Sequence, residues 1–333
     1  MGSERGRAAL RSGDRHVVEQ VRRLCALAGL ELDVVAPGSA PPAADVLLDD
    51  RTDPAGPAWA RTAERGHVVE LGAGAGTLRL PADAEALLGI LGDAAAPRRA
   101  RVVGVVGAVG GVGASALAAV VARLAVAAGR AGALVDLDPA GGGLDVLLGI
   151  EHDPGPRWGD VLGQQGGFPP DRLMAALPTW HGVHVLSADV RGGVDPDDAV
   201  ALAAADALTR AADAVVLDLP RAVLAPGGEP TWPALCAAVV LLTACDTRSA
   251  AAATVAGRML AGRELHLVVR GPAPGSLLPE DVADVAGLPL AAVMRPERAF
   301  TAGLERGLSP GDQRRGPLLA TARRLLPALG LHP

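Results

Sequence analysis

The stretch that decides the fold is Gly107-Ala108-Val109-Gly110-Gly111-Val112-Gly113-Ala114-Ser115. An apolar run at residues 102–106 precedes it, and an alanine-rich segment at 115–128 follows it with helical spacing. Glycines at such a junction let the backbone turn sharply with its amide N–H groups facing inward, and the helix dipole adds positive potential. Strand, glycine loop and helix in this order predict a phosphate-binding loop, with the Ser115 hydroxyl as a ligand of Mg²⁺. The alternative is a glycine-rich turn that binds nothing.

The rest of the chain repeats strand and helix signals. Apolar runs are separated by segments long enough for crossover helices, at residues 133–137, 183–186, 214–219, 238–243 and 265–269. Continuous apolar strands joined in this way imply a parallel sheet covered on both faces. We therefore expect an α/β fold with a doubly wound, mostly parallel sheet over residues 102–333, closed by a helix at 318–329.

A smaller α/β pattern precedes this domain. Helical spacing at residues 17–27 is followed by strand signals at 30–35, 46–48 and 67–71. A polar segment with a proline and three arginines then reads as a linker. The expected organisation is a domain at 1–95, a linker at 96–101 and the larger domain at 102–333.

Composition limits the function classes. The 333 residues carry a net charge of −6, which argues against a protein that mainly coats nucleic acid. The three cysteines have no metal-like spacing, no apolar run is long enough to cross a bilayer, and the N-terminus lacks a signal-peptide pattern. These features predict a cytoplasmic protein. The chain contains no Lys, Asn or Tyr, so all 31 basic residues are Arg.

The glycine loop resembles the deviant Walker motif of the MinD/ParA family of P-loop ATPases, whose pattern is Gly-Lys-Gly-Gly-x-Gly-Lys-Ser/Thr. Gly110, Gly111, Gly113 and Ser115 match it. Ala108 replaces the first glycine, Val109 replaces the signature lysine, and Ala114 replaces the Walker lysine. Since this chain uses Arg wherever else it needs a cation, the two charges are dispensable here.

Two further motifs resemble those of the same family. Leu134-Val135-Asp136-Leu137-Asp138-Pro139, with Leu144-Asp145-Val146-Leu147-Leu148-Gly149 after it, looks like the second-strand Asp-x-Asp motif and its continuation. Val215-Val216-Leu217-Asp218-Leu219-Pro220 looks like Walker B. The ordinary alternative for each aspartate is a solvated residue at a strand end or a helix cap.

The resemblance implies a role for each matching residue. Asp138 would orient the attacking water and is the expected catalytic residue. Ser115, Asp136 and Asp218 would surround Mg²⁺. Nucleotide contacts are expected from Gly110, Gly111, Val112, Gly113, Ala114, Ser115 and Arg270, the last because it follows strand 265–269, where the family commonly places an adenine-contacting residue. The expected cofactors are ATP and Mg²⁺, bound weakly or lost.

The front domain and the loop variant resemble the CpaE-like branch, in which the front domain is similar to a response-regulator receiver. Asp49 and Asp50 follow a strand as a phosphoacceptor would, but no lysine completes an acidic pocket and no first strand is recognisable. Asp49 is therefore expected to be structural.

The branch implies a protein that positions septum, pilus or secretion machinery and forms a homodimer. The absence of both P-loop lysines implies weak or lost ATPase activity. The alternative is an active ATPase that uses other cations. A deviant-Walker tyrosine kinase is excluded because the chain has no Tyr. A partition protein bound to nucleic acid is disfavoured by the charge. The helix at 318–329, with Leu318, Leu319, Ala322, Leu325, Leu326 and Leu329, could make a peripheral membrane contact, although packing on the domain is the favoured use.

Overall fold

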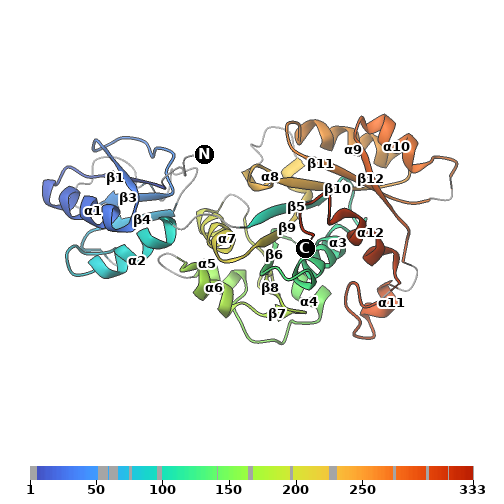
Figure 1. The fold of residues 1–333 in the computed structure, drawn as a ribbon, viewed down its shortest axis with the longest axis horizontal. Helices are drawn as coiled ribbons and strands as arrows, with labels where there is room; N and C mark the ends of the chain where they lie inside the picture. The colour runs from blue at the N-terminus through green and yellow to red at the C-terminus, as the bar shows by residue number, and fades with distance from the viewer. Residues whose placement is uncertain are drawn as a thin grey trace. The chain divides into compact units, whose positions relative to one another are not determined.

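The computed structural model describes residues 6–51, 59, 67–74, 77–95, 100–140, 142–163, 168–195, 198–224, 231–272, 275–297, 300–313 and 315–332. The chain divides into two compact units (Figure 1). The first comprises Met1–Arg98, Val161–Leu173 and Asp197–Arg210, and the second comprises Arg99–Asp160, Met174–Pro196 and Ala211–Pro333.

The N-terminal part of the chain forms a small α/β fold. Its elements are β1 (Arg7–Arg11), α1 (Arg15–Ala28), β2 (Glu31–Val35), β3 (Val46–Asp50), β4 (His67–Leu71) and α2 (Ala84–Ala95). The four strands are parallel in the order β2-β1-β3-β4, which is the order of the first four strands in flavodoxin-like sheets. Helices α1 and α2 pack against each other over a core that includes Leu10, Leu48 and Leu87.

The expectation that this sheet lacks its first strand was wrong. Strand β1 lies inside the sheet, between β2 and β3, and its residues Ala8, Ala9 and Leu10 are fully buried. The run is only three apolar residues long and has an arginine at each end, so it carries little of the signal by which buried strands are recognised. The strands and helix predicted after it are confirmed.

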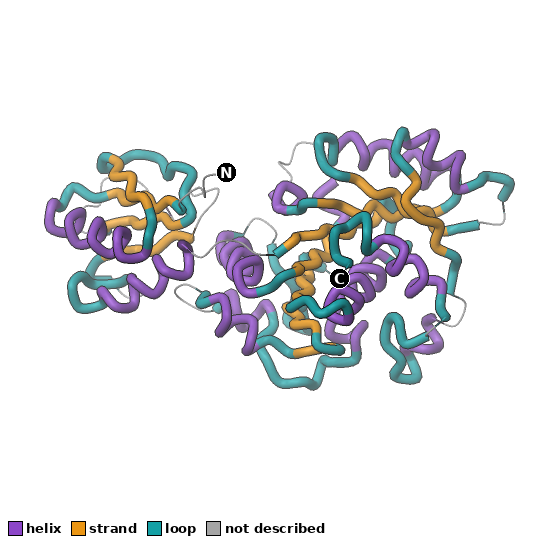
Figure 2. The backbone as a smooth tube through the Cα atoms, in the orientation of Figure 1, coloured by secondary structure: helices purple, strands orange, loops and turns teal. Residues whose placement is uncertain are grey.

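The chain from Arg101 onward contains both strands and helices (Figure 2). The strands are β5 (Arg101–Gly107), β6 (Gly132–Asp136), β7 (Thr179–Trp180), β8 (Val183–Leu186), β9 (Ala214–Leu219), β10 (Ala238–Ala244), β11 (Leu265–Arg270) and β12 (Leu290–Met294). The helices are α3 (Ala114–Ala127), α4 (Leu144–Leu148), α5 (Trp158–Leu162), α6 (Pro170–Ala176), α7 (Ala199–Ala211), α8 (Thr231–Leu235), α9 (Thr247–Met259), α10 (Pro279–Ala286), α11 (Phe300–Leu304) and α12 (Pro317–Leu325), with a 3-10 turn at Arg221–Leu224.

The eight strands form one sheet in the order β12-β11-β10-β5-β9-β6-β8-β7. All neighbours are parallel except the short edge strand β7, which pairs antiparallel with β8. The predicted doubly wound, mostly parallel sheet is therefore confirmed. Because β5 is central, the glycine loop that follows it opens at the middle of the carboxyl edge of the sheet. Of the predicted linker 96–101, residues 96–99 lie outside the described residues, and Arg101 already belongs to β5.

Helices cover both faces of this sheet. On one face α3 packs over β5, β6 and β9, and α12 packs on α3 and β12, while α9 and α10 cover β10 and β11 on the other (Figure 1). Small aliphatic side chains fill these layers: Ala118, Ala119, Val120 and Val121 of α3 are fully buried. This close packing is possible because alanine lets the helix approach the sheet backbone.

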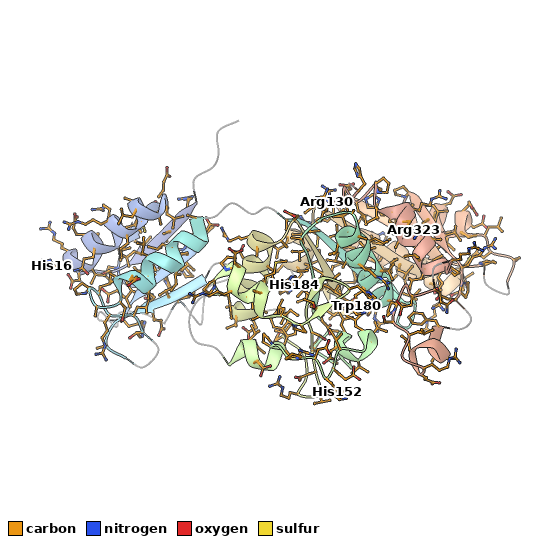
Figure 3. The ribbon with its side chains drawn as sticks, turned by 60° about the horizontal axis from the view of Figure 1, so that its bottom comes forward. His16, Arg130, His152, Trp180, His184 and Arg323 are labelled. Atoms are coloured by element: carbon orange, nitrogen blue, oxygen red, sulfur yellow. The ribbon has the colours of Figure 1, made fainter. Side chains whose placement is uncertain are left out.

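The last helix uses its apolar face for packing. Leu318, Leu319, Ala322 and Leu325 are buried in the core under α3, whereas Arg323, labelled in Figure 3, is exposed. That apolar face is therefore not free to enter a lipid surface in this structure. Among the described residues, no helix has the length and apolar content that crossing a membrane would need.

The hairpin of β7 and β8 is tied to the loop that leads into α12. Trp180, labelled in Figure 3, donates its indole N–H to the Ser309 hydroxyl at 3.2 Å. The Arg123 guanidinium stacks over the Trp180 ring at 5.5 Å and pairs with Asp312 at 2.8 Å. These contacts join α3, the edge hairpin and the C-terminal part of the chain around the core.

Candidate nucleotide site

The glycine loop makes the sharp turn that its composition predicts. Gly111 and Gly113 have φ angles of 71° and 98°, in the left-handed region that residues with a Cβ atom avoid. Helix α3 begins directly after the loop, and no side chain caps its first turn. Among the described residues, the amide groups at the start of α3 therefore have no side-chain acceptor, and free amides at a helix N-terminus can bind an anion.

The two positions that lack lysine are occupied by side chains of the core. Val109 and Ala114 are both half-buried and pack against the main hydrophobic cluster. Neither residue brings a charge to the loop, so the anion-binding potential of this end of α3 comes from its backbone.

Ser115 and Asp218 are brought together. Asp218 lies near the end of β9, the strand next to β5, and its carboxyl group is hydrogen-bonded to the Ser115 side chain. Asp218 is only 5% exposed. Burial raises the pKa of Asp218 to about 7, the carboxylates of Asp136 and Asp138 add to this, and the bond from Ser115 opposes it.

Asp136 lies at the end of β6, directly across from Asp218 in the strand register. Its carboxylate accepts backbone N–H groups from Asp138 at 3.1 Å, Leu144 at 3.0 Å and Ala188 at 3.3 Å. The Ser187 hydroxyl adds a longer contact at 3.4 Å. Burial raises the pKa of Asp136 despite these bonds. Both carboxylate oxygens of Asp136 thus hold the turn around Asp138.

Asp138 is held by its backbone while its side chain stays partly exposed. Its N–H donates to Asp136 and one carboxylate oxygen accepts the Ala140 N–H at 3.1 Å. A Cβ atom on Gly193 would lie 2.2 Å from the Asp138 carbonyl oxygen, so the segment after β8 packs directly on this turn. In the described part of the chain no partner meets the other carboxylate oxygen of Asp138, which leaves it available to a water molecule or ligand.

Arg270, at the end of β11, reaches the loop itself. Its Nη1 donates to the carbonyl oxygens of Gly111 and Val112, both at 3.2 Å. A hollow of about 300 Å³ opens beside this contact. Its lining consists of Val109, Gly110, Gly111 and Val112 from the loop, together with Ala244, Cys245, Arg270, Pro272 and Pro296.

The donor set fits a magnesium ion only in part. Mg²⁺ in phosphate sites takes one or two carboxylates or hydroxyls and completes its shell with water and phosphate oxygens. Ser115 and Asp218 supply such oxygens next to the loop. Within the described residues, however, no group of three or more His, Cys, Asp and Glu side chains could hold a metal by itself. An ion at this site would therefore depend on ligands from a bound phosphate.

Several residues of the site were not predicted. Trp158 is fully buried and donates its indole N–H to the Asp136 carbonyl oxygen at 2.5 Å. Arg157 is also buried, and its guanidinium pairs with the Asp145 carboxylate at 3.3 Å. The Ser187 hydroxyl accepts the backbone N–H of Asp145 at 3.0 Å. The one available signal was the presence of a tryptophan in a chain with 2% aromatic residues. That signal does not say which atom the indole meets.

Comparisons with solved structures identify the architecture. A ParA family ATPase from Chlorobium tepidum matches over 69% of this chain and 98% of its own, with a TM-score of 0.55 and 16% identity. MinD in the MinC:MinD cell division complex of Aquifex aeolicus matches over 68% and 96%, with a TM-score of 0.54 and 21% identity. The cell division ATPase MinD of Pyrococcus furiosus matches over 68% and 99%, with a TM-score of 0.52 and 21% identity.

The chain contains the MinD/ParA fold. The central β5, the loop before α3 and the neighbouring β9 and β6 belong to this fold. No family model matches the chain. Two uncharacterized proteins of Mycobacterium tuberculosis, from strains CDC 1551 / Oshkosh and ATCC 25618 / H37Rv, are each 45% identical to it over 215 residues. Each match covers 62% of this chain and 59% of the relative, so it spans about three fifths of the relative's length.

The fold ahead of this MinD/ParA architecture holds a separate charged pair. Asp49 is fully buried and accepts two bonds from Arg11, Nε to Oδ1 at 2.9 Å and Nη2 to Oδ2 at 2.8 Å. It also accepts the Trp59 N–H at 3.0 Å. Asp50 is bonded by the Ser12 hydroxyl at 2.5 Å. Both oxygens of Asp49 are therefore engaged at the place where a phosphoacceptor was considered.

Proposed function

We propose that this chain is a MinD/ParA-type P-loop protein that positions septum, pilus or secretion machinery, with its nucleotide chemistry weakened. The observation that carries the proposal is the combination of an intact loop with missing cations. Ser115 and Asp218 lie next to the uncapped start of α3, while Val109 and Ala114 are apolar, half-buried and packed against the core. A homodimer and a CpaE-like front domain belong to the same proposal.

Weak binding follows from the magnitude of the missing interactions. A hydrogen bond from a charged donor contributes roughly 1.5 to 3 kcal/mol, so each absent lysine lowers nucleotide affinity by about ten- to a hundredfold. Hydrolysis depends more strongly on a cation at the transferring phosphoryl group, an effect on the order of 10³ to 10⁵ in rate. A protein with this site would hold ATP loosely and turn it over slowly.

Within this proposal, Asp138 is the residue that would orient an attacking water. Ser115 and Asp218 would hold Mg²⁺, which when bound would neutralise phosphate charge. Asp136 would act on the reaction indirectly, because its carboxylate holds the turn that carries Asp138. The loop residues 110–115 would hold the phosphates through their backbone.

The second candidate function is an active ATPase that draws its cation from elsewhere. One observation favours it: the Arg270 guanidinium already lies against the loop, bonded to Gly111 and Val112. If an arginine of this chain or of a second subunit reached the transferring phosphoryl group, hydrolysis at an ordinary rate would follow.

Calorimetric titration of the purified chain with ATP and Mg²⁺, paired with a steady-state phosphate-release assay, separates the two. The proposal expects binding that is weak and turnover at or near background. Turnover that is lost in Asp138→Ala would establish the active ATPase instead. Absence of any binding to nucleotide would remove both functions.

We also propose that residues 1–95 form a separate domain, joined through 96–101 to the domain at 102–333. This division is supported by two sheets that share no strand and by two separate hydrophobic clusters. Deletion of residues 1–95 is expected to leave a soluble, folded protein, and circular dichroism of the shortened chain tests it.

A further inference from the structure

Arg270 is the feature that the MinD/ParA-type function leaves unexplained. One nitrogen of its guanidinium, Nη1, carries two N–H groups and donates to two successive carbonyl oxygens of the loop, those of Gly111 and Val112, each at 3.2 Å. Among the described residues no acidic side chain pairs with Arg270. Its position at the end of β11, two strands away from β5, fixes the side chain at the carboxyl edge of the sheet.

The direction of these two carbonyl groups decides the direction of two amides. In a trans peptide the C=O and the N–H of the same unit point in opposite directions. The carbonyls of Gly111 and Val112 face Arg270, so the N–H groups of Val112 and Gly113, which share their peptide units, face away from it. Those two amides belong to the part of the loop that leads into the uncapped first turn of α3.

In the part of the chain that the structure describes, neither the Val112 nor the Gly113 N–H donates to a backbone or side-chain acceptor. Val112 is itself only 4% exposed. Buried amide groups are almost always paired, so an unpaired one next to an uncapped helix marks a place for an acceptor from outside the chain.

We propose that Arg270 is a positioning residue that orients the loop amides toward a phosphate group. By binding the carbonyl side of the loop, its guanidinium turns the Val112 and Gly113 N–H groups to the other side, and it draws electron density toward the carbonyls. In a loop without lysines, this contact keeps the backbone ready to bind an anion. The inference rests on the proposed nucleotide function, and it assigns Arg270 an effect on phosphate through the loop in place of a contact with the base.

The test uses the full chain, with pyrophosphate and ADP as two probes. Pyrophosphate has no base, so it reports only on the phosphate-binding loop. Arg270→Ala is expected to weaken the binding of both probes by about tenfold, the effect of losing one hydrogen bond between a loop amide and a charged phosphate. Arg270→Lys keeps a charged donor and should fall between the wild type and Ala. Arg258→Ala removes one exposed arginine of α9 with the same change in net charge, and it should bind like the wild type.

A second measurement does not depend on ligand binding. In ¹⁵N-resolved NMR spectra without ligand, Arg270→Ala should shift the amide signals of Val112 and Gly113, with Arg258→Ala leaving them in place. Unchanged amide signals would overturn the inference, whether or not the chain binds a ligand. If the wild-type chain binds neither pyrophosphate nor ADP, the proposed nucleotide function fails, and the NMR comparison still tests the inference. A loss of affinity for ADP with unchanged affinity for pyrophosphate would also overturn it, since Arg270 would then contact the base.

Discussion

The Ser115 side chain, at the start of α3, is hydrogen-bonded to the carboxyl group of Asp218, near the end of β9. The bond joins the phosphate loop to the neighbouring strand without any ligand. Asp218 is buried, with two further carboxylates near it, and these raise its pKa to about 7. The group is therefore close to half-ionised near neutral pH, and its charge state is coupled to the stability of the whole site.

The first prediction is a loss of stability as pH rises from about 4 to about 7. The pKa of Asp218 is higher in the folded chain than its ordinary value of 3.8, so the folded state holds the proton more tightly. The stabilisation is complete below the unfolded value and disappears as pH passes through the folded one. The difference between the two values corresponds to at most about 4 kcal/mol. Urea unfolding at a series of pH values measures it.

Asp218→Asn removes the ionisable group and keeps a side chain that can bond to Ser115. The variant should be more stable than the wild type at pH 8 and nearly equal to it at pH 4. Asp136, whose pKa is also raised by burial, would leave a smaller pH dependence in the variant. If Asp218→Asn lowered stability equally at both pH values, the ionisation account would be wrong.

The second prediction concerns the lost Walker lysine. Ala114→Lys should tighten ATP binding by about ten- to a hundredfold if the loop keeps its phosphate-binding geometry, because one charged hydrogen bond is regained. Ala114 packs against the core, so any longer side chain at this position changes that packing. Ala114→Met, which has a side chain of similar length to lysine and no charge, controls for this change. Calorimetry compares the three proteins. Equal affinities for the Lys and Met variants would indicate a loop that no longer binds phosphate.

The third prediction concerns the buried pair of Arg11 and Asp49. Removing Arg11 leaves the buried Asp49 carboxylate with the half-buried Arg51 guanidinium, 3.5 Å away, as its remaining charged partner among the described residues, so Arg11→Met should lower the free energy of unfolding by at most about 3 to 5 kcal/mol. The double variant Arg11→Met/Asp49→Leu replaces both charges by apolar groups and should recover most of that loss. Chemical denaturation of the single and double variants decides the point. An equally unstable double variant would show that packing over Trp59, 5.0 Å from the Arg11 guanidinium carbon, matters more than charge.

Phosphorylation of the same aspartate is expected to fail. Both oxygens of Asp49 are bonded to Arg11, and the residue is fully buried, so acetyl phosphate has no free oxygen to meet. Intact-mass measurement after incubation should show an unmodified chain. An adduct mapped to Asp49 would mean that the pair opens in solution.

The fold could be predicted from the sequence largely because buried parallel strands have unbroken runs of apolar residues. That signal located β5, β9 and β10 and placed Asp218 at its strand end. It missed β1, whose apolar run is three residues long, and the two-residue edge strand β7. Apolar runs of two or three residues also occur in loops, so their pattern does not identify a strand.

The site was predictable in its residue types and less so in their contacts. The motifs brought Ser115 and Asp218 to one place, as the structure does. They did not indicate that the Asp136 carboxylate accepts the N–H groups of Asp138, Leu144 and Ala188, because nearly every residue type has the same backbone donor and acceptor and a sequence pattern does not distinguish them. For the same reason the contact of Arg270 with the loop carbonyls could not be derived from the position of the residue after its strand.

The last prediction concerns assembly. In the family that the loop resembles, the signature lysine of each subunit reaches the phosphates of the other, so the triphosphate favours the dimer. Here Val109 stands at that position, half-buried against the core, and it can make no contact that distinguishes ATP from ADP. A ligand shifts an equilibrium only by its differential affinity for the two states. Any dimer formed through this face should therefore be nearly indifferent to nucleotide.

Light scattering of the chain alone, with ADP and with a non-hydrolysable ATP analogue should give one mass. Val109→Lys restores the reaching charge and should make the mass depend on the triphosphate, with Val109→Met as the uncharged control. A wild-type chain that dimerises only with the ATP analogue would show that another residue performs the gating.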